Sequence, residues 1–206
     1  MNDAQRTERF EAIRAELEQE GWHGISCTIS VLKANLMAFV TAGPIAAVCA
    51  VVFILTKSGV SGGFGIRELL IFYALLLASI FVHEGLHGLA WSLFCKHGWK
   101  SIHLGVMWKK LTPYCCCMEP LAFGPYLVGG LAPLVVLGFG LFAAAMLTGS
   151  VLLLLLSLVN ILAAGGDTTI ALMLLRHRKA RIMDHPTACG FWAFYPKESG
   201  EQVDGI

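Results

Sequence analysis

The sequence predicts an all-α integral membrane protein, a bundle of about four transmembrane helices. Of its 206 residues, 56% are hydrophobic and only 14% are charged, whereas soluble domains carry roughly 25% charged residues. The mean hydropathy is +0.69. The apolar residues gather in stretches long enough to cross a bilayer, which takes about 20 residues in a helix. The net charge of +1 gives no reason to expect nucleic acid as a partner.

The apolar stretches divide the chain into a leader, a transmembrane domain and a tail. In the leader, Phe10, Ile13 and Leu17 recur at helical spacing among charged residues. This pattern predicts an amphipathic helix, in the cytosol or on the membrane surface. The tail is predicted to be cytosolic, with a disordered polar end. The three parts cover residues 1–33, 34–181 and 182–206, and the expected spans cover residues 34–56, 69–95, 123–147 and 151–175.

Residues 96–120, between the second and third expected spans, have a different composition. They contain four lysines, two histidines and two prolines, and their alternation predicts a short irregular or β-hairpin-like segment. With both termini inside, these lysines share the cytosolic side with the four basic residues of 176–181, and the outer loops hold only Lys57 and Arg67. Because Lys and Arg are enriched in cytoplasmic loops, we expect an N-in, C-in protein of a bacterial cytoplasmic membrane.

The second expected span contains an H-E-x-x-H motif, made of His83, Glu84 and His87. From residue 69 to 95, these are the only Asp, Glu, His, Lys or Arg residues. Helix positions i and i+4 lie one turn apart on one face. The two imidazoles can therefore hold one Zn²⁺ per chain, and Glu84 is placed to act as the catalytic base.

Asp167 is the only ionisable residue in the fourth expected span. A carboxylate inside a bilayer costs on the order of 2.5–3.5 kcal/mol and needs a partner. Asp167 and His87 each lie eight residues before the inner end of their spans, at about 12 Å from the cytosolic boundary. We therefore expect Asp167 to be the third zinc ligand, in an active site toward the cytosolic half. In the alternative, Asp167 pairs with a protonated histidine without metal.

Other polar residues leave alternatives open. Asn160 lies seven residues before Asp167 on the same helix face, where it can orient substrate, stabilise an oxyanion or hydrogen-bond a neighbouring helix. Three consecutive cysteines can supply thiolate ligands or act as small packed residues: Cys115, Cys116 and Cys117. The seven cysteines of the chain indicate no disulfide framework. The remaining candidates are expected to be interfacial or solvated: His23, His97, His103 and Glu119.

An H-E-x-x-H in one membrane helix, with an aspartate from a later one, resembles the intramembrane zinc metalloproteases of the site-2 protease type. The resemblance implies that His83, His87 and Asp167 bind zinc and that Glu84 is the base. The sequence departs from that pattern because no proline lies between Asn160 and Asp167, and because threonine follows the aspartate.

The chain resembles more closely a small bacterial family of membrane proteins of unknown function, described as zincin peptidases. The activity of that family is inferred from its motif, so the resemblance supports a metal site more strongly than a reaction. The likeness covers about residues 20–195. It is carried by H-E-x-x-H-G at 83–88, Cys117-Met-Glu-Pro120, Ala132-Pro133, Gly166-Asp167 and Asp184-His-Pro186 with Gly190.

Together these observations predict an intramembrane zinc metalloprotease that hydrolyses peptide bonds of membrane-associated substrates. Two alternatives stay open: a zinc-dependent membrane hydrolase of a non-protein substrate, and a non-catalytic metal-binding membrane protein. The expected partners are the lipid bilayer and a membrane-protein or peptide substrate. The expected cofactor is one zinc ion per chain.

Overall fold

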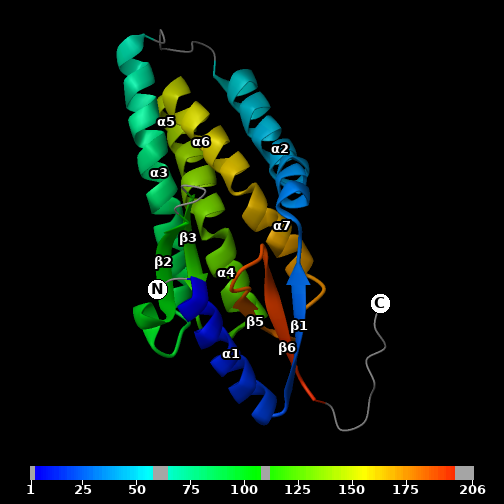
Figure 1. The fold of residues 1–206 in the computed structure, drawn as a ribbon. Helices are drawn as coiled ribbons and strands as arrows, with labels where there is room; N and C mark the ends of the chain where they lie inside the picture. Colours follow the sequence, from blue (N-terminus) through cyan, green and yellow to red (C-terminus); the bar gives the residue numbers. More distant parts are fainter. Residues whose placement is uncertain (1–2, 58–64, 108–111, 198–206) are drawn as a thin grey trace.

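The structure is a computed structural model that describes residues 3–57, 65–107 and 112–197. In Figure 1 the long helices lie side by side, and the four-stranded sheet and helix α1 lie toward one end of them. The protein therefore has a helical region and a region built around a sheet.

Among the described residues, the helical region contains three helical stretches that are long and apolar enough to cross a membrane, and a bent helix pair that can form a fourth. This agrees with the expected integral membrane protein of about four spans. The first two spans are α2 (Val31–Thr56) and α3 (Ile66–Ser92). The third consists of α4 (Phe123–Pro133), the π-helical stretch η2 (Leu134–Gly140) and α5 (Leu141–Thr148). The bent pair is α6 (Val151–Ala163) and α7 (Gly165–Leu174).

Helices α6 and α7 are bent by 42° relative to each other, at Ala164. Directly after the bend, Gly165 lies against α2, where a Cβ would lie 2.5 Å from the Cβ of Ala38 and 2.8 Å from its Cα. No larger residue fits there without a shift of α2 or α7. The bend starts a new helix inside the apolar stretch, and it places Asp167 in the first turn of that helix.

The protein is mostly helical, as predicted, but the described residues also form six strands, so it is not all-α. Strands β2 (Ile102–Met107) and β3 (Thr112–Cys117) pair antiparallel, which confirms the hairpin expected between the second and third spans. A 3-10 turn, η1 (Gly98–Ser101), precedes them. The other strands form one antiparallel sheet in the order β1-β6-β5-β4. They are β1 (Trp22–Thr28), β4 (Leu121–Ala122), β5 (Arg181–Asp184) and β6 (Gly190–Pro196).

The four-stranded sheet joins the two ends of the chain. Strand β1 pairs with β6 from Trp22 opposite Pro196 to Thr28 opposite Gly190. An alternating pattern in a short segment indicates a strand but does not identify a partner so distant in the sequence. The sheet was therefore missed because β1 with β6 and β4 with β5 pair across long stretches of the chain, although β5 and β6 are close in the sequence.

Helix α1 (Asp3–Gln19) packs against this sheet (Figure 1). Phe10 and Leu17 of α1 are buried in one cluster with Met183 of β5 and Phe194 of β6. The apolar face of the expected leader is thus covered by the protein's own sheet. The predicted division at residues 33 and 181 stays a prediction. The polar end that was predicted to be disordered falls mainly on residues 198–206, which lie outside the described residues.

Candidate metal centre

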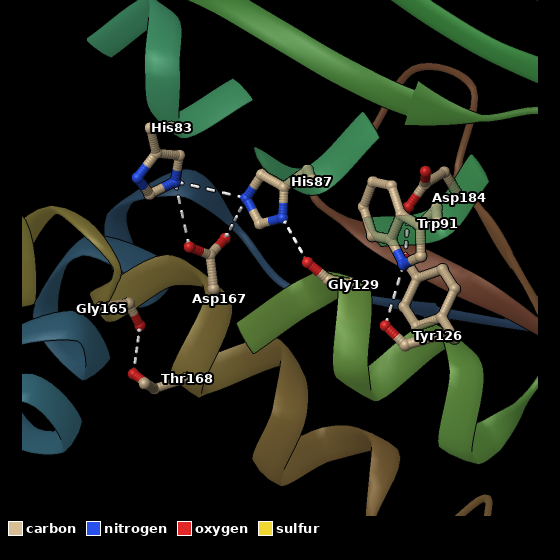
Figure 2. A network of polar contacts seen from close by, with 9 residues as sticks. All are labelled: His83, His87, Trp91, Tyr126, Gly129, Gly165, Asp167, Thr168 and Asp184. Carbon is tan, nitrogen blue, oxygen red and sulfur yellow. Dashed lines mark hydrogen bonds and ion pairs between the residues drawn. The ribbon is translucent and has the colours of Figure 1, made fainter. Parts of the chain in front are cut away.

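Helix α3 presents both histidines of the H-E-x-x-H motif on one face, as the i, i+4 spacing predicts. The Nε2 atoms of His83 and His87 lie 3.3 Å apart, and the ring centroids are 4.9 Å apart. Figure 2 shows that both rings point toward the first turn of α7. The two imidazoles therefore converge on a single point.

Asp167 of α7 lies at that point. Its Oδ2 atom is 3.2 Å from Nε2 of His83, and its Oδ1 atom is 3.5 Å from Nε2 of His87 (Figure 2). The three residues form a group whose ligand atoms all lie within 4.8 Å of one another, and the described parts of the chain contain no second group of this kind. The structure therefore brings together the three residues that the sequence selected.

The geometry of this group fits a zinc ion. With metal–nitrogen distances of about 2.0–2.1 Å, the ligand atoms of a tetrahedral zinc site are roughly 3.3 Å apart, close to the observed 3.2, 3.3 and 3.5 Å. The Oδ2 atom of Asp167 is buried and accepts no aligned hydrogen bond from any described residue, although a histidine nitrogen lies nearby. A buried carboxylate oxygen that faces an imidazole nitrogen in this way needs a proton or a cation between them.

His87 is held in a fixed orientation by α4. Its Nδ1 atom donates a hydrogen bond to the carbonyl oxygen of Gly129 at 2.8 Å, which leaves the Nε2 lone pair free for a metal. The ring of Trp91 stacks on His87 with a centroid distance of 5.1 Å and an interplanar angle of 16°. A Cβ at Gly129 would lie 2.0 Å from the indole ring of Trp91. Glycine is therefore required at the residue whose carbonyl group orients His87.

Asp167 is held by contacts between α7 and α2. The carbonyl oxygen of Gly165 accepts hydrogen bonds from the hydroxyl groups of Thr168, at 2.9 Å, and Thr169, at 2.8 Å. The hydroxyl groups of Thr41 in α2 and Thr168 are 2.7 Å apart. The first turn of α7 is thereby fixed against α2, and the positive end of the helix dipole there favours a carboxylate.

Glu84 lies beside the ligand group without belonging to it. It lines a cavity of 190 Å³ that also contains His87 and Asp167. The backbone amide of Cys115 in β3 donates a hydrogen bond to the Glu84 carboxylate. The other residues that line the cavity are Trp91, Pro113, Tyr114, Cys115, Tyr126, Leu127, Gly130, Ile170, Ala171, Leu174, Asp184 and Gly190.

The structure does not bring the other predicted candidates into the ligand group. The Asn160 side chain donates to the carbonyl oxygen of Leu156 in its own helix, at 2.8 Å, and it does not line the cavity. Cys115 lines the cavity, but the sulfur of Cys117 lies 3.5 Å from that of Cys95 instead. Burial raises the pKa of the Cys115, Cys116 and Cys117 thiols. These thiols are therefore protonated at neutral pH, which favours their role as packed side chains.

Three residues of the site were not selected from the sequence: Trp91, Tyr126 and Asp184. The side chain of Asp184 accepts a hydrogen bond from the Cys117 amide at 2.6 Å and another from the Tyr126 hydroxyl group. Burial raises the pKa of Asp184, and these two hydrogen bonds partly oppose that effect. The sequence singled out Asp184 only as part of the Asp-His-Pro motif. Its segment was assigned to the cytosolic tail, so no role at the site was expected for it.

Comparison with known proteins identifies a family. Residues 76–182 match the sequence model of the family described as "Putative zincin peptidase". The matched region contains the H-E-x-x-H motif, the β2–β3 hairpin, α4 and Asp167. No curated protein and no solved structure matches the chain.

Proposed function

The chain belongs to this family, and from that premise we propose that it is an intramembrane zinc metallopeptidase that cleaves membrane-associated polypeptides. One observation carries the proposal: His83, His87 and Asp167, from two helices, hold three ligand atoms at the spacing of a tetrahedral zinc site. A zinc ion held there would supply a Lewis acid that polarises a carbonyl group and lowers the pKa of a water molecule.

Glu84 is the proposed general base. It follows His83 directly in α3 and shares the cavity with His87 and Asp167, but it is not one of the three grouped ligands. Its carboxylate is therefore free to take a proton from the attacking water and to deliver that proton to the leaving amine. The hydrogen bond from the Cys115 amide fixes the carboxylate at the wall of the cavity.

Strand β3 is the proposed binding site for an extended substrate. Pro113, Tyr114 and Cys115 line the cavity, and β2 is the only strand that pairs with β3 among the described residues. On the edge of β3 that does not pair with β2, the Cys115 and Cys117 amides already donate to Glu84 and Asp184, so an extended peptide there would bond to the main-chain carbonyl groups of that edge. Substitution of the residues of β3 that face the cavity should raise KM, and unchanged cleavage kinetics would count against this role.

The proposed setting is a bacterial cytoplasmic membrane, with both termini in the cytosol and the site toward the cytosolic half of the bilayer. The bilayer and a membrane-associated polypeptide are the proposed partners. The candidate spans support the membrane setting, and the distribution of Lys and Arg supports the orientation.

The test is the metal content of the purified protein, never exposed to chelator, for the wild type, Asp167→Ala and Glu84→Gln. We expect about one zinc per chain in the wild type and in Glu84→Gln, and much less in Asp167→Ala, because only the aspartate substitution removes a ligand. Zinc retained in Asp167→Ala would show that a residue other than Asp167 is the third ligand. A metal-free wild type would overturn the proposal.

A hydrolase of a non-protein membrane substrate shares the same machinery. Glu84→Gln inactivates both kinds of enzyme, so they are separated by the substrate. Wild-type protein in vesicles is therefore offered a membrane-anchored polypeptide and a lipid-linked ester. Cleavage of the polypeptide alone supports the peptidase, and cleavage of the ester alone contradicts it.

A further inference from the structure

Asp184 has no role in the proposed chemistry, yet it lines the cavity that contains Glu84, His87 and Asp167. It comes from β5, near the C-terminal end of the chain and outside the helices that hold the ligands. Its carboxylate faces Tyr126 in Figure 2. Burying a carboxylate in a cavity wall costs free energy unless hydrogen bonds replace its lost contacts with water. The partners of its two hydrogen bonds therefore indicate what Asp184 does.

One hydrogen bond of Asp184 reaches the strand that contacts Glu84. Its Oδ2 atom accepts the amide of Cys117 at 2.6 Å, and the amide of Cys115 donates to Glu84. Residues i and i+2 of a strand direct their amides to the same edge. Asp184 and Glu84 therefore bind adjacent donors on one edge of β3, so a shift of the strand at Cys117 would also displace the amide that holds Glu84.

The other hydrogen bond of Asp184 reaches His87 through α4. The Oδ1 atom accepts the hydroxyl group of Tyr126, and the carbonyl oxygen of Tyr126 accepts the indole N–H of Trp91 at 2.9 Å (Figure 2). Trp91 stacks on His87 and lies against Gly129, whose carbonyl group orients the same histidine. The position of α4 at Tyr126 thus affects the plane of the His87 ring.

We infer that Asp184 is a positioning residue that fixes both the His87 ring and the Glu84 carboxylate, through Tyr126 and Cys117 respectively. It is not a metal ligand, because it lies outside the group formed by His83, His87 and Asp167. The inference rests on the proposed function in that it assumes a metal at that group.

The test compares four variants of the full chain in detergent: Asp184→Leu, Asp184→Asn, Tyr126→Phe and Tyr195→Phe. Leucine keeps the branched shape of the Asp184 side chain, although it is larger, and it accepts neither hydrogen bond. Asparagine keeps an oxygen for the Cys117 amide, and its NH₂ group can donate to the Tyr126 hydroxyl oxygen. Tyr195→Phe is the matched control for Tyr126→Phe, because it also removes a hydrogen-bonded hydroxyl group, one paired with His177 at 2.6 Å.

Two quantities are measured: the zinc dissociation constant by chelator competition, and the visible absorption spectrum of the Co²⁺-loaded protein. We expect Asp184→Leu to weaken zinc binding by about 10-fold to 100-fold and to change the Co²⁺ bands, as loss of outer contacts to a metal ligand does. Tyr126→Phe should also weaken zinc binding and change the Co²⁺ bands, but by a smaller amount. Asp184→Asn should restore most of the affinity, and Tyr195→Phe should match the wild type.

Wild-type affinity and Co²⁺ bands in both Asp184→Leu and Tyr126→Phe would overturn the inference and leave the proposed function intact. If Asp184→Leu does not fold, the result for Tyr126→Phe alone decides whether the inference holds.

A wild type that binds no metal would overturn the proposed function. In that case hydrogen exchange at the Cys115 and Cys117 amides tests whether Asp184 holds strand β3. Faster exchange in Asp184→Leu than in Asp184→Asn would support this role, and equal exchange would contradict it.

Discussion

The helical region and the four-stranded sheet bury their apolar side chains in opposite ways. On α3, Leu70 is 66% exposed and Phe81 is 65% exposed, whereas Phe191 and Phe194 of β6 are fully buried. Where helices α2 and α6 meet the third span, small residues such as Ala42 allow close contact. The exposed apolar side chains support the proposal that lipid covers the outside of the helices, while the sheet has a core like that of a soluble domain.

The candidate metal site lies where these two regions meet. The three grouped ligands and Glu84 come from α3 and α7. The contacts that position them come partly from β3, through Cys115, and from β5, through Asp184. The helices therefore supply the candidate metal ligands and the proposed base, and the strands help to fix their geometry. Four predictions test this division of roles between the helices and the strands.

The largest expected effect is on the chemistry supplied by the helices. Glu84→Gln should lower hydrolysis by about 10²-fold to 10⁴-fold, because an amide cannot take the proton of the attacking water. Zinc content should stay at the wild-type level, since Glu84 is not in the ligand group. Single-turnover hydrolysis of a membrane-anchored polypeptide, measured together with zinc content, checks this. Full activity in the variant would assign the base elsewhere.

The second prediction tests the two kinds of burial directly. Phe194→Ala should lower the free energy of unfolding by about 3–5 kcal/mol, because it leaves a cavity in the core between α1 and the sheet. Leu70→Ala should change it by about 0.5 kcal/mol or less, because this side chain already lies on the outer surface. Denaturant unfolding in the same detergent measures both. Equal losses would contradict the proposed contact of α3 with lipid.

The third prediction concerns two adjacent glycines of α4. Gly129→Ala should destabilise the protein by about 1–3 kcal/mol and weaken zinc binding, because its Cβ would lie 2.0 Å from the Trp91 ring. Gly130→Ala is the matched control, since no atom lies within 4 Å of its added Cβ. Thermal unfolding and zinc titration measure both effects. If the two variants behave alike, the contact between α4 and Trp91 does not orient His87.

The smallest expected effect is a pH dependence at Glu119, where the β3 hairpin returns to α4. Burial alone would raise the pKa of Glu119, but hydrogen bonds from Ser101, His97 and two backbone amides lower the pKa below its usual range. A lowered pKa in the folded state contributes stability above the unfolded pKa, and this contribution is lost as pH falls through the folded value. Glu119→Gln should therefore be slightly less stable than the wild type at pH 7, and the difference should vanish below about pH 4. Melting curves across this range check the sign, and a difference that grows toward low pH would contradict it.

Sequence patterns determined the local parts of this protein. Long uncharged stretches indicated the membrane helices because the bilayer requires about 20 apolar residues in each span. The H-E-x-x-H spacing placed His83 and His87 on one face because the helix repeats every 3.6 residues. Asp167 was identified because an isolated carboxylate in an apolar span needs a partner, and its equal depth with His87 indicated which partner.

Only the tertiary structure decided the contacts that depend on distant pairing. The sheet joins Trp22 to Pro196 across nearly the whole chain, and no local period encodes that choice. The same pairing brings Asp184 from the expected tail to Tyr126 and Cys117 at the cavity. The sequence by itself therefore determined which side chains can hold a metal, because that depends on residue type and helical spacing. The tertiary structure decided what holds them in place, because that depends on which strands pair.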